Sequence, residues 1–461
     1  MRDERHVVIV GGGASGTLTA IQLLRRGGPW LAVTVVEPRA ALGLGVAFGT
    51  PDPWHRLNVP AVTMSGLIED PDHFWRWAGV PHDWFPDRAT FGRYLGALLA
   101  EARDGSAVAF EHVRSRVTAI DAAVPPGDAI GVALEVGAAM AADAVVVATG
   151  NELPAVPAFL RDVAASGDPR FVRDPWAGAA LEAVMPGETV LIVGTGHTAM
   201  DLAASVIRGR GAGRVVAVSR HGELPRTHEE PWRPAPRPPL FTPADLASWG
   251  DPLAEAAARI RAHPDGWRQG LDSLRPIHRD LWLALDAPTR RRFVTELRRD
   301  WEIHRSRVSA GVGRDIEAWV AVGTLAIVAA GIRSVASVPD GLRVETEAGT
   351  WTVAHVLLAT GPDESSSASP ILAGLVESGV ARPGSMDLGI DVDVSTFRLL
   401  DPDGGTPRPV YALGPLIRGS VWETIAVSEI RVEAAAIATD ILASLQADDA
   451  QLHPHEPPPV R

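Results

Sequence analysis

The sequence lacks two residue types that carry much of enzyme chemistry. It contains no cysteine, and all 43 residues counted as lysine or arginine are arginine. The first absence excludes disulfides, thiolate metal sites and thiol nucleophiles. The second excludes Schiff-base lysines and phosphate loops that depend on lysine. No histidine pair has the His-x₃-His spacing of a metal site, so we expect no metal.

Long hydrophobic runs are also absent, although 46% of the residues are hydrophobic. No uninterrupted apolar stretch reaches the roughly 18 residues that a membrane span needs, and the N-terminus enters a strand without a signal-peptide pattern. The net charge of −13 argues against a general nucleic-acid binder. We therefore expect a cytoplasmic protein of two or three domains.

The stretch VVIVGGGASG, at residues 7–16, has the form of a dinucleotide-binding turn between a strand and a helix. Its first glycine makes the tight turn, its second lets the backbone approach a pyrophosphate, and its third lets helix and strand pack closely. Glu37 closes the next strand, where a carboxylate accepts hydrogen bonds from a ribose. The helix N-terminus adds N–H donors. We assign to this site Gly11, Gly13, Ser15, Gly16 and Glu37.

A second turn of this kind, IVGTGHTAMD, occupies residues 192–201. Its third position is Ala199, whose methyl group moves helix and strand slightly apart, as NADP sites often tolerate. One strand later, Arg220 stands where an NAD site carries an acid, and its planar fork suits a 2′-phosphate. Arg226 is a candidate second clamp. We assign to an NADPH site Gly194, Gly196, Thr198, Ala199 and Arg220.

Two apolar strands end in Ala-Thr-Gly, at residues 145–150 and 356–361. In flavoproteins with two dinucleotide sites, such strands lead the chain between the domains, and their small residues let the backbone pass close to a cofactor. The pattern indicates FAD in the first site and NADPH in the second, with hydride passing from NADPH to FAD. Disulfide reductases of this plan need a cysteine pair, which is missing here. The open acceptors are oxygen with an organic substrate, an electron carrier or quinone, and oxygen alone.

The order of these segments predicts an α/β fold of two Rossmann-like dinucleotide-binding domains with a helical insertion. The FAD-binding domain is split between residues 1–155 and 325–446. It encloses an NADPH-binding domain at 156–240 and a mostly helical insertion at 241–324. The tail at 447–461 is expected to be disordered.

Several segments resemble a family of FAD/NAD(P)-binding proteins, most of which have no assigned activity. These are LGLGVAFGTPDPWHRLNVPAVTMS (42–65), DPDHFWRWAG (70–79), FGRYLGALL (91–99), WEIHRSRV (301–308) and YALGPLIRGSVWETIAVSEIRVEAAAIA (411–438). The family is similar in plan to the flavin-dependent N-hydroxylating monooxygenases, among them aspartate N-oxygenases. The resemblance implies a C4a-hydroperoxyflavin, formed from NADPH, FAD and O₂, that oxygenates a small amine or amino acid.

The chain departs from related flavoproteins in two places. Before the second glycine turn it keeps Phe171 and Trp176 but lacks the glycine and histidine of the Baeyer–Villiger fingerprint, so that chemistry is disfavoured. At 412–416 the sequence ALGPL has Pro415 where many relatives carry an aspartate for the ribityl chain. We therefore expect backbone groups around Gly414 to take over this contact.

The resemblance also places HRLNVPA, residues 55–61, along the flavin, where Asn58 can both donate and accept hydrogen bonds. The alternative is an asparagine in a turn before Pro60. Trp422 either walls the flavin pocket or belongs to the core. The FAD contacts expected outside the glycine turn are Asn58, Val59, Val117, Thr149, Gly150, Gly414 and Trp422.

The segment WEIHRSRV has a helical spacing that places Trp301, His304 and Arg305 on one side. Arg305 is a candidate clamp for a substrate carboxylate, and His304 a candidate proton carrier. Alternatively, the arginines of this region form a solvated helix face.

The sequence thus favours an NADPH-dependent FAD monooxygenase that N-hydroxylates or N-oxygenates a small amine or amino acid. Two alternatives stay open. One is an NADPH-dependent flavin reductase that passes electrons to a carrier or quinone, and the other is a non-enzymatic flavin-binding redox sensor. The identity of the substrate and the formation of a homo-oligomer are also open.

Overall fold

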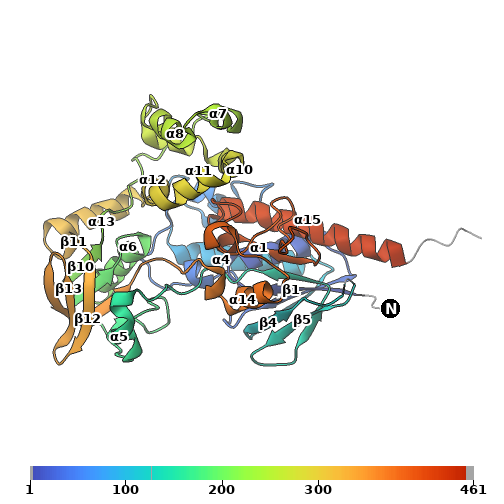
Figure 1. The fold of residues 1–461 in the computed structure, drawn as a ribbon, viewed down its shortest axis with the longest axis horizontal. Coiled ribbons are helices and arrows are strands. Elements are labelled where there is room, and N and C mark those ends of the chain that lie inside the picture. The colour runs from blue at the N-terminus through green and yellow to red at the C-terminus, as the bar shows by residue number, and fades with distance from the viewer. Residues whose placement is uncertain (1–3, 126, 453–461) are drawn as a thin grey trace, which may run out of the picture.

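The structure, a computed structural model, describes residues 4–125 and 127–452. Two α/β units lie side by side, and a set of helices lies over the junction between them (Figure 1). We call them the first unit, built on the sheet that contains β1, the second unit, built on the sheet that contains β9, and the helical layer, residues 243–305.

The first sheet is parallel, with the strand order β16-β7-β1-β2-β3. Its central strands are buried on both faces, which explains why they read as continuous apolar runs. Helix α1 packs against both α4 and α15. The elements are β1 (Arg5–Val10), β2 (Leu31–Val36), β3 (Ala109–Val113), β7 (Ala144–Val147), β16 (Val410–Ala412), α1 (Ala14–Arg26), α4 (Arg88–Asp104) and α15 (Val427–Leu452).

The second sheet is also parallel, with the order β11-β10-β9-β15-β8. Helices α6 and α13 pack on it, and the π-helical turn η3 continues α6. Its elements are β8 (Phe171–Val172), β9 (Thr189–Val193), α6 (His197–Ala204), η3 (Ser205–Gly209), β10 (Arg214–Ser219), α13 (Ala310–Ala321), β11 (Leu325–Ala329) and β15 (His355–Leu358).

This arrangement differs from the predicted division at residue 325. Strands β11 and β15 were expected in the FAD-binding domain, but they complete the second sheet by pairing with β10 and β9. The Ala-Thr-Gly that follows β15 therefore lies beside the second glycine turn, as the one after β7 lies beside the first. Each strand that leads into Ala-Thr-Gly thus belongs to the same unit as the glycine turn beside it. The chain returns to the first unit only after β15.

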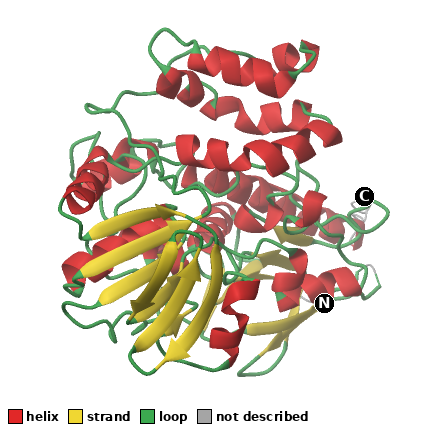
Figure 2. Ribbon diagram, turned by 60° about the vertical axis from the view of Figure 1, so that its left-hand side comes forward, coloured by secondary structure: helices red, strands yellow, loops and turns green. Residues whose placement is uncertain are grey.

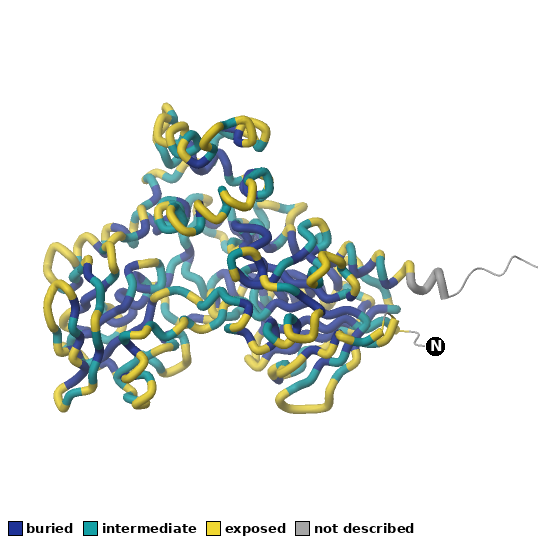
Figure 3. The backbone as a smooth tube through the Cα atoms, viewed as in Figure 1, coloured by how far each residue is buried: buried dark blue, intermediate teal, exposed yellow. Residues whose placement is uncertain are grey.

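The two units repeat one plan. In each, a three-stranded antiparallel sheet comes directly before the strand that ends in Ala-Thr-Gly. Figure 3 shows a separate buried core in each unit. The small sheets consist of β4 (Val117–Asp121), β5 (Ile130–Leu134) and β6 (Met140–Ala142), and of β12 (Ile332–Val338), β13 (Gly341–Thr346) and β14 (Gly349–Val353).

The helical layer stands above the two sheets (Figure 2) and is joined to the first unit by an apolar cluster. Trp282 and Phe293 from the layer contact Trp422 from the first unit with ring centroids 5.6 and 5.2 Å apart. The layer consists of α7 (Pro243–Ser248), α8 (Pro252–Arg261), α9 (Trp267–Asp272), η4 (Arg275–Ile277), α10 (His278–Ala284), α11 (Ala287–Arg292), η5 (Phe293–Leu297) and α12 (Arg298–Arg305).

Short helices connect these parts of the chain. They are α2 (Gly45–Phe48), η1 (Ala61–Thr63), α3 (His73–Ala78), η2 (Ala158–Leu160), α5 (Arg161–Ala165), η6 (Ser366–Ala368), α14 (Pro370–Glu377), η7 (Ser385–Asp387) and η8 (Gly414–Ile417). Helix α15 extends to Leu452, past the predicted start of a disordered tail at 447, and residues 453–461 lie outside the described residues. Among the described helices, none combines the length and the apolar character of a membrane span.

Candidate functional site

The first glycine turn brings strand β1, helix α1 and the end of β7 into close contact. Gly11 has φ of 102°, and a Cβ atom built on it would lie 2.5 Å from the carbonyl oxygen of Ala148. A Cβ on Gly16 would lie 1.9 Å from the carbonyl oxygen of Gly11. Neither position has room for a side chain. The N-terminus of α1 has no side-chain cap, so its N–H groups are free to bind a phosphate.

Glu37 lies where the sequence predicts it, directly after β2, and its carboxylate is buried. One carboxylate oxygen accepts a hydrogen bond from the Gly12 amide at 2.9 Å, and the other accepts from the Arg39 amide at 3.0 Å. The hydroxyl of Thr149, at the end of β7, is buried without a hydrogen-bond partner among the described residues. The Thr149 hydroxyl without a partner, the uncapped N-terminus of α1 and the crowded glycines fit a dinucleotide such as FAD.

Gly414 and Ser15, two of the predicted FAD residues, lie together. A Cβ atom on Gly414 would lie 2.8 Å from the hydroxyl oxygen of Ser15. The Gly414 amide donates to the carboxyl group of Glu433 at 2.9 Å, and the Thr424 hydroxyl donates to its other oxygen at 2.5 Å. Burial raises the pKa of Glu433 to about 7. Of the backbone groups around Gly414 that were expected to serve the cofactor, the Gly414 amide is therefore taken by Glu433.

Glu433 was not predicted from the sequence, and its local signal is weak. It is a single acidic residue in the apolar stretch of α15, and a glutamate in such a helix is equally well interpreted as lying on the solvent-exposed face. Of the other predicted FAD residues, Val59 and Val117 pack at the edge of the first core. Gly150 has φ of 76°, a conformation that favours glycine. Trp422 is buried in the apolar cluster of the helical layer and also lines the cleft described below, so both alternatives stay open.

Asn58 is half-buried at the junction of the two units. Its backbone carbonyl accepts a hydrogen bond from Nε2 of His228 at 2.9 Å. Burial, with a further contribution from Arg307, lowers the pKa of His228 to about 3, so this ring is neutral. Asn58 is thus held by residues of a segment that follows the second nucleotide turn.

The second glycine turn repeats the geometry of the first at its opening position. Gly194 has φ of 123°, and a Cβ atom on it would lie 2.3 Å from the carbonyl oxygen of Ala359. Gly196 caps α6 without a side-chain hydrogen bond, and nothing lies within 4 Å of a Cβ built on it. Ala199 is fully buried in the second core, so its methyl group is part of the packing between α6 and the sheet.

A cleft of about 670 Å³ runs from the second glycine turn to the first unit. Arg220 lines it with an exposed side chain that has no bonded partner among the described residues, whereas Arg226 does not line it. Glu223 also lines it but is paired with Arg299 at 2.6 Å, which lowers the pKa of Glu223. The lining includes Gly194, Gly196, Thr198, Arg220 and Glu223 of the second unit, Arg299, Trp301 and Arg305 of the helical layer, and Arg418, Trp422 and Glu423 of the first unit.

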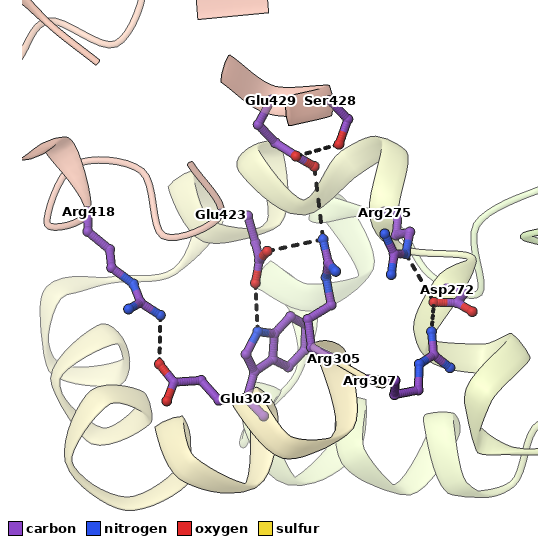
Figure 4. Close-up of polar contacts among 10 residues, drawn as sticks. Asp272, Arg275, Glu302, Arg305, Arg307, Arg418, Glu423, Ser428 and Glu429 are labelled. Atoms are coloured by element: carbon purple, nitrogen blue, oxygen red, sulfur yellow. Dashed lines mark hydrogen bonds and ion pairs between the residues drawn. The ribbon is translucent and has the colours of Figure 1, made fainter. Parts of the chain in front are cut away.

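Arg305 is buried, with 5% of its surface exposed, and points from α12 towards the first unit (Figure 4). It forms ion pairs with Glu423 at 3.2 Å and with Glu429 at 4.0 Å. Glu423 also accepts a hydrogen bond from the indole of Trp301 at 2.7 Å. Burial alone would raise the pKa of Glu423, but Arg305 and its other neighbours hold it at about 2. The charge of Arg305 is therefore already balanced.

His304 does not join this network. Its Nδ1 lies 2.7 Å from the carbonyl oxygen of Asp300 in the same helix, and its ring meets the edge of Trp267. It is not among the residues that line the cleft. Of the three residues expected on one side of α12, Trp301 and Arg305 lie together and both contact Glu423, whereas His304 lies apart from them.

A second buried charged group was not foreseen from the sequence. Asp272 accepts a hydrogen bond from Nε of Arg275 at 3.0 Å and another from Arg307. Burial, followed by the nearby charge of Arg305, lowers the pKa of Arg275 to about 10. The terminal guanidinium nitrogens of Arg275 have no hydrogen-bond partner among the described residues. Its position beside Arg305 (Figure 4) favours the approach of an anion.

Comparison with known proteins agrees with this geometry. The family model described as FAD-NAD(P)-binding matches residues 8–152. No curated protein sequence matches the chain. The structure is similar to that of reduced ornithine hydroxylase from Pseudomonas aeruginosa, with 15% identity and a TM-score of 0.65 over 96% of this chain and 100% of that chain.

Two further solved structures share the fold over 96% of this chain and 100% of their own. One is L-lysine 6-monooxygenase from Pseudomonas syringae, with 16% identity and a TM-score of 0.61. The other is the ornithine N-hydroxylase of Kutzneria sp. 744 with reduced FAD, NADP⁺ and L-ornithine, with 19% identity and a TM-score of 0.57. The predicted resemblance is confirmed: residues 8–152 match the FAD-NAD(P)-binding family model, and the chain shares the fold of these solved structures.

Proposed function

We propose that the protein is a two-dinucleotide flavoprotein, an NADPH-dependent FAD monooxygenase that N-hydroxylates a small amine. The observation that carries this proposal is the cleft of about 670 Å³, because it joins the second glycine turn to residues 418–425, close to the FAD turn. The cleft reaches from the second glycine turn to the segment after Gly414, and Gly414 lies against Ser15 of the first turn, so ligands of the two turns could meet there for hydride transfer. The absence of cysteine leaves no thiol pair as acceptor.

The proposed reaction is R–NH₂ + O₂ + NADPH + H⁺ → R–NHOH + NADP⁺ + H₂O. When bound, FAD supplies hydride acceptance and oxygen activation. The chain's own residues hold the two cofactors with the glycine turns, Glu37 and Arg220, and they limit the entry of water with the apolar cluster around Trp422. The fold shared with ornithine and lysine hydroxylases supports an amine as substrate.

The charges at the junction support an amine that also carries a carboxylate. Arg305 is neutralised by two glutamates, so it is a poor clamp for a substrate. The terminal nitrogens of Arg275, beside it, have no hydrogen-bond partner among the described residues, and Arg275 does not line the cleft, so it can anchor only a carboxylate that reaches beyond the cleft lining. A diamine is a poorer substrate for such a site, because its second ammonium group and the Arg275 guanidinium are both positively charged and repel each other.

The function is tested by an assay of NADPH oxidation, oxygen uptake and hydroxylamine formation with acidic amino acids, diamines and neutral amino acids. We expect an acidic amino acid to give hydroxylamine in proportion to NADPH consumed. Fast NADPH-driven reduction of a quinone without hydroxylamine would instead indicate a reductase. A flavin that NADPH does not reduce would indicate a redox sensor.

The Arg220→Ala variant is expected to lose most of its preference for NADPH over NADH. Hydrogen bonds to a charged group contribute about 1.5–3 kcal/mol, so we expect the ratio of kcat/KM values to fall about 10- to 100-fold. Arg226→Ala is the matched control, because Arg226 is exposed nearby but does not line the cleft. An unchanged preference in Arg220→Ala would refute the assignment of the 2′-phosphate site.

A further inference from the structure

A buried polar contact joins the loop at residues 50–58 of the first unit to the helix that follows the second glycine turn. His55 is 3% exposed, and its Nε2 lies 2.7 Å from the hydroxyl oxygen of Ser205, which is 4% exposed. Nδ1 of His55 lies 2.8 Å from the hydroxyl oxygen of Thr50. Ser205 begins the π-helical turn η3, so the contact falls where α6 departs from regular helix geometry.

The direction of these hydrogen bonds follows from the number of protons available. The Ser205 hydroxyl has one hydrogen, which it donates to the carboxylate of Asp52. Nε2 of His55 must therefore donate to Ser205, because the serine oxygen can still accept. His55 and Asp52 thus hold one serine of the second unit between them, and both belong to the first unit.

A second contact holds the same helix face. Arg88, at the start of α4, forms an ion pair with Asp201 of α6 at 2.8 Å. Asp201 and Ser205 are four residues apart and therefore lie on one side of the helix. The opposite side of α6, with Ala199, Leu202 and Ala203, packs into the second core. Helix α6 is thus fixed to its own unit by apolar packing and to the first unit by polar contacts.

The other end of the loop is held by His228, which follows strand β10 of the second unit. As described above, His228 donates to the carbonyl oxygen of Asn58 at 2.9 Å. The loop that leads to the expected flavin contacts Asn58 and Val59 is therefore tied down at His55 and at Asn58. Both ties come from the part of the chain that carries the NADPH turn.

We infer that His55 and Ser205 form a strut that fixes the NADPH-binding helix against the flavin loop and so sets the geometry for hydride transfer. The inference rests on the proposed function, since it needs both cofactors. His55 is a positioning residue, because it acts through Ser205 and α6 and lines no part of the cleft. Reacting atoms must approach to about 3–3.5 Å, and a misplacement of about 1 Å can cost 100-fold in rate.

The test compares Ser205→Ala and His55→Ala with the unaltered holoenzyme in anaerobic flavin reduction by NADPH. We expect the limiting reduction rate at saturating NADPH to fall about 10- to 100-fold, while the NADPH concentration for half the limiting rate stays close to normal. The absorbance of the complex between NADPH and flavin should weaken. His55→Gln, whose amide can still donate to Ser205, should recover part of the rate.

A second measurement does not depend on activity. Amide hydrogen exchange of residues 50–58 and 197–209, in protein with and without FAD, should be faster in Ser205→Ala than in the parent. Ser106→Ala is the matched control, because the Ser106 hydroxyl bonds the carbonyl of Leu24 within the first unit. It should change neither exchange nor reduction.

The outcomes separate the strut from the proposed function. If NADPH fails to reduce the flavin of the unaltered protein, the proposed function fails, and unchanged exchange in Ser205→Ala then overturns the strut independently. If the parent is reduced normally and both variants keep its limiting rate, the strut plays no part in hydride transfer. Should His55→Ala not fold, Asp201→Asn weakens the parallel contact to Arg88 and must lower the same rate.

Discussion

Gly16→Ala is expected to lose FAD. A methyl group at this position would lie 1.9 Å from the carbonyl oxygen of Gly11, and backbone atoms cannot move aside as a flexible side chain can. The added atom therefore forces α1 away from β1 and displaces the N–H groups that would hold the pyrophosphate. Overpacking of this kind costs about 1–3 kcal/mol, which corresponds to about 10- to 100-fold weaker FAD binding.

The measurement is the ratio of flavin to protein in the purified variant, followed by titration with FAD. Gly96→Ala in α4 is the control, since the nearest atom to its Cβ would be 3.9 Å away and alanine favours a helix. The second turn provides a natural comparison, because Ala199 already occupies the equivalent position there. Normal FAD content in Gly16→Ala would contradict the assignment of the first turn.

Glu423→Ala is expected to destabilise the protein by about 3–5 kcal/mol, because it leaves Arg305 buried without its nearer carboxylate. The pair is 3.2 Å apart, and the second carboxylate, Glu429, is 4.0 Å from the guanidinium. The variant also removes the acceptor of the Trp301 indole. Glu423→Gln keeps an acceptor for Trp301 and should lose less. Urea unfolding of the FAD-bound protein measures both changes.

The stabilisation by the Glu423 carboxylate depends on pH over a defined range. Its folded pKa of about 2 lies below the ordinary value of 4.5, so the unfolded chain binds the proton more tightly. The stabilisation is fully present above pH 4.5 and is lost as the pH falls towards 2. Glu255→Ala is the control, since its pair with Arg259 is exposed and is worth at most about 1 kcal/mol. Equal losses of unfolding free energy in Glu423→Ala and Glu255→Ala would show that the buried ion pair stabilises the protein no more than an exposed pair does.

The sequence predicted best what lies close together along the chain. Gly11, Gly16 and Glu37 belong to one strand–helix–strand unit, and the spacing of these residues sets their geometry directly. The Ala-Thr-Gly strand at 356–361 was recognised as a strand but placed in the wrong unit. Apolar periodicity identifies a buried parallel strand without identifying its neighbour, and β15 pairs with β9 across a long insertion.

Contacts between segments that lie far apart along the chain could not be predicted, because a local pattern does not identify the partner of a residue. The helical spacing of Trp301 and Arg305 was predicted, but their shared partner Glu423 comes from another unit. Glu433 and Ser205 carry no local signal, because each has the composition expected of its helix and gains its role only from a residue elsewhere in the chain. Charge patterns indicate where arginines lie, but not which of them a carboxylate has already neutralised.

The insertion of one unit within the other also fixes an order of assembly during synthesis. The second sheet has all its strands once residue 358 has been made, whereas the first sheet waits for β16 and its covering helix α15. Strand β7 must therefore leave one side unpaired while residues 148–409 are translated, although domains tend to fold as they emerge. The unit whose first strand is made earlier is therefore the later of the two to close, and a nascent chain acquires its FAD pocket only after α15 has been made.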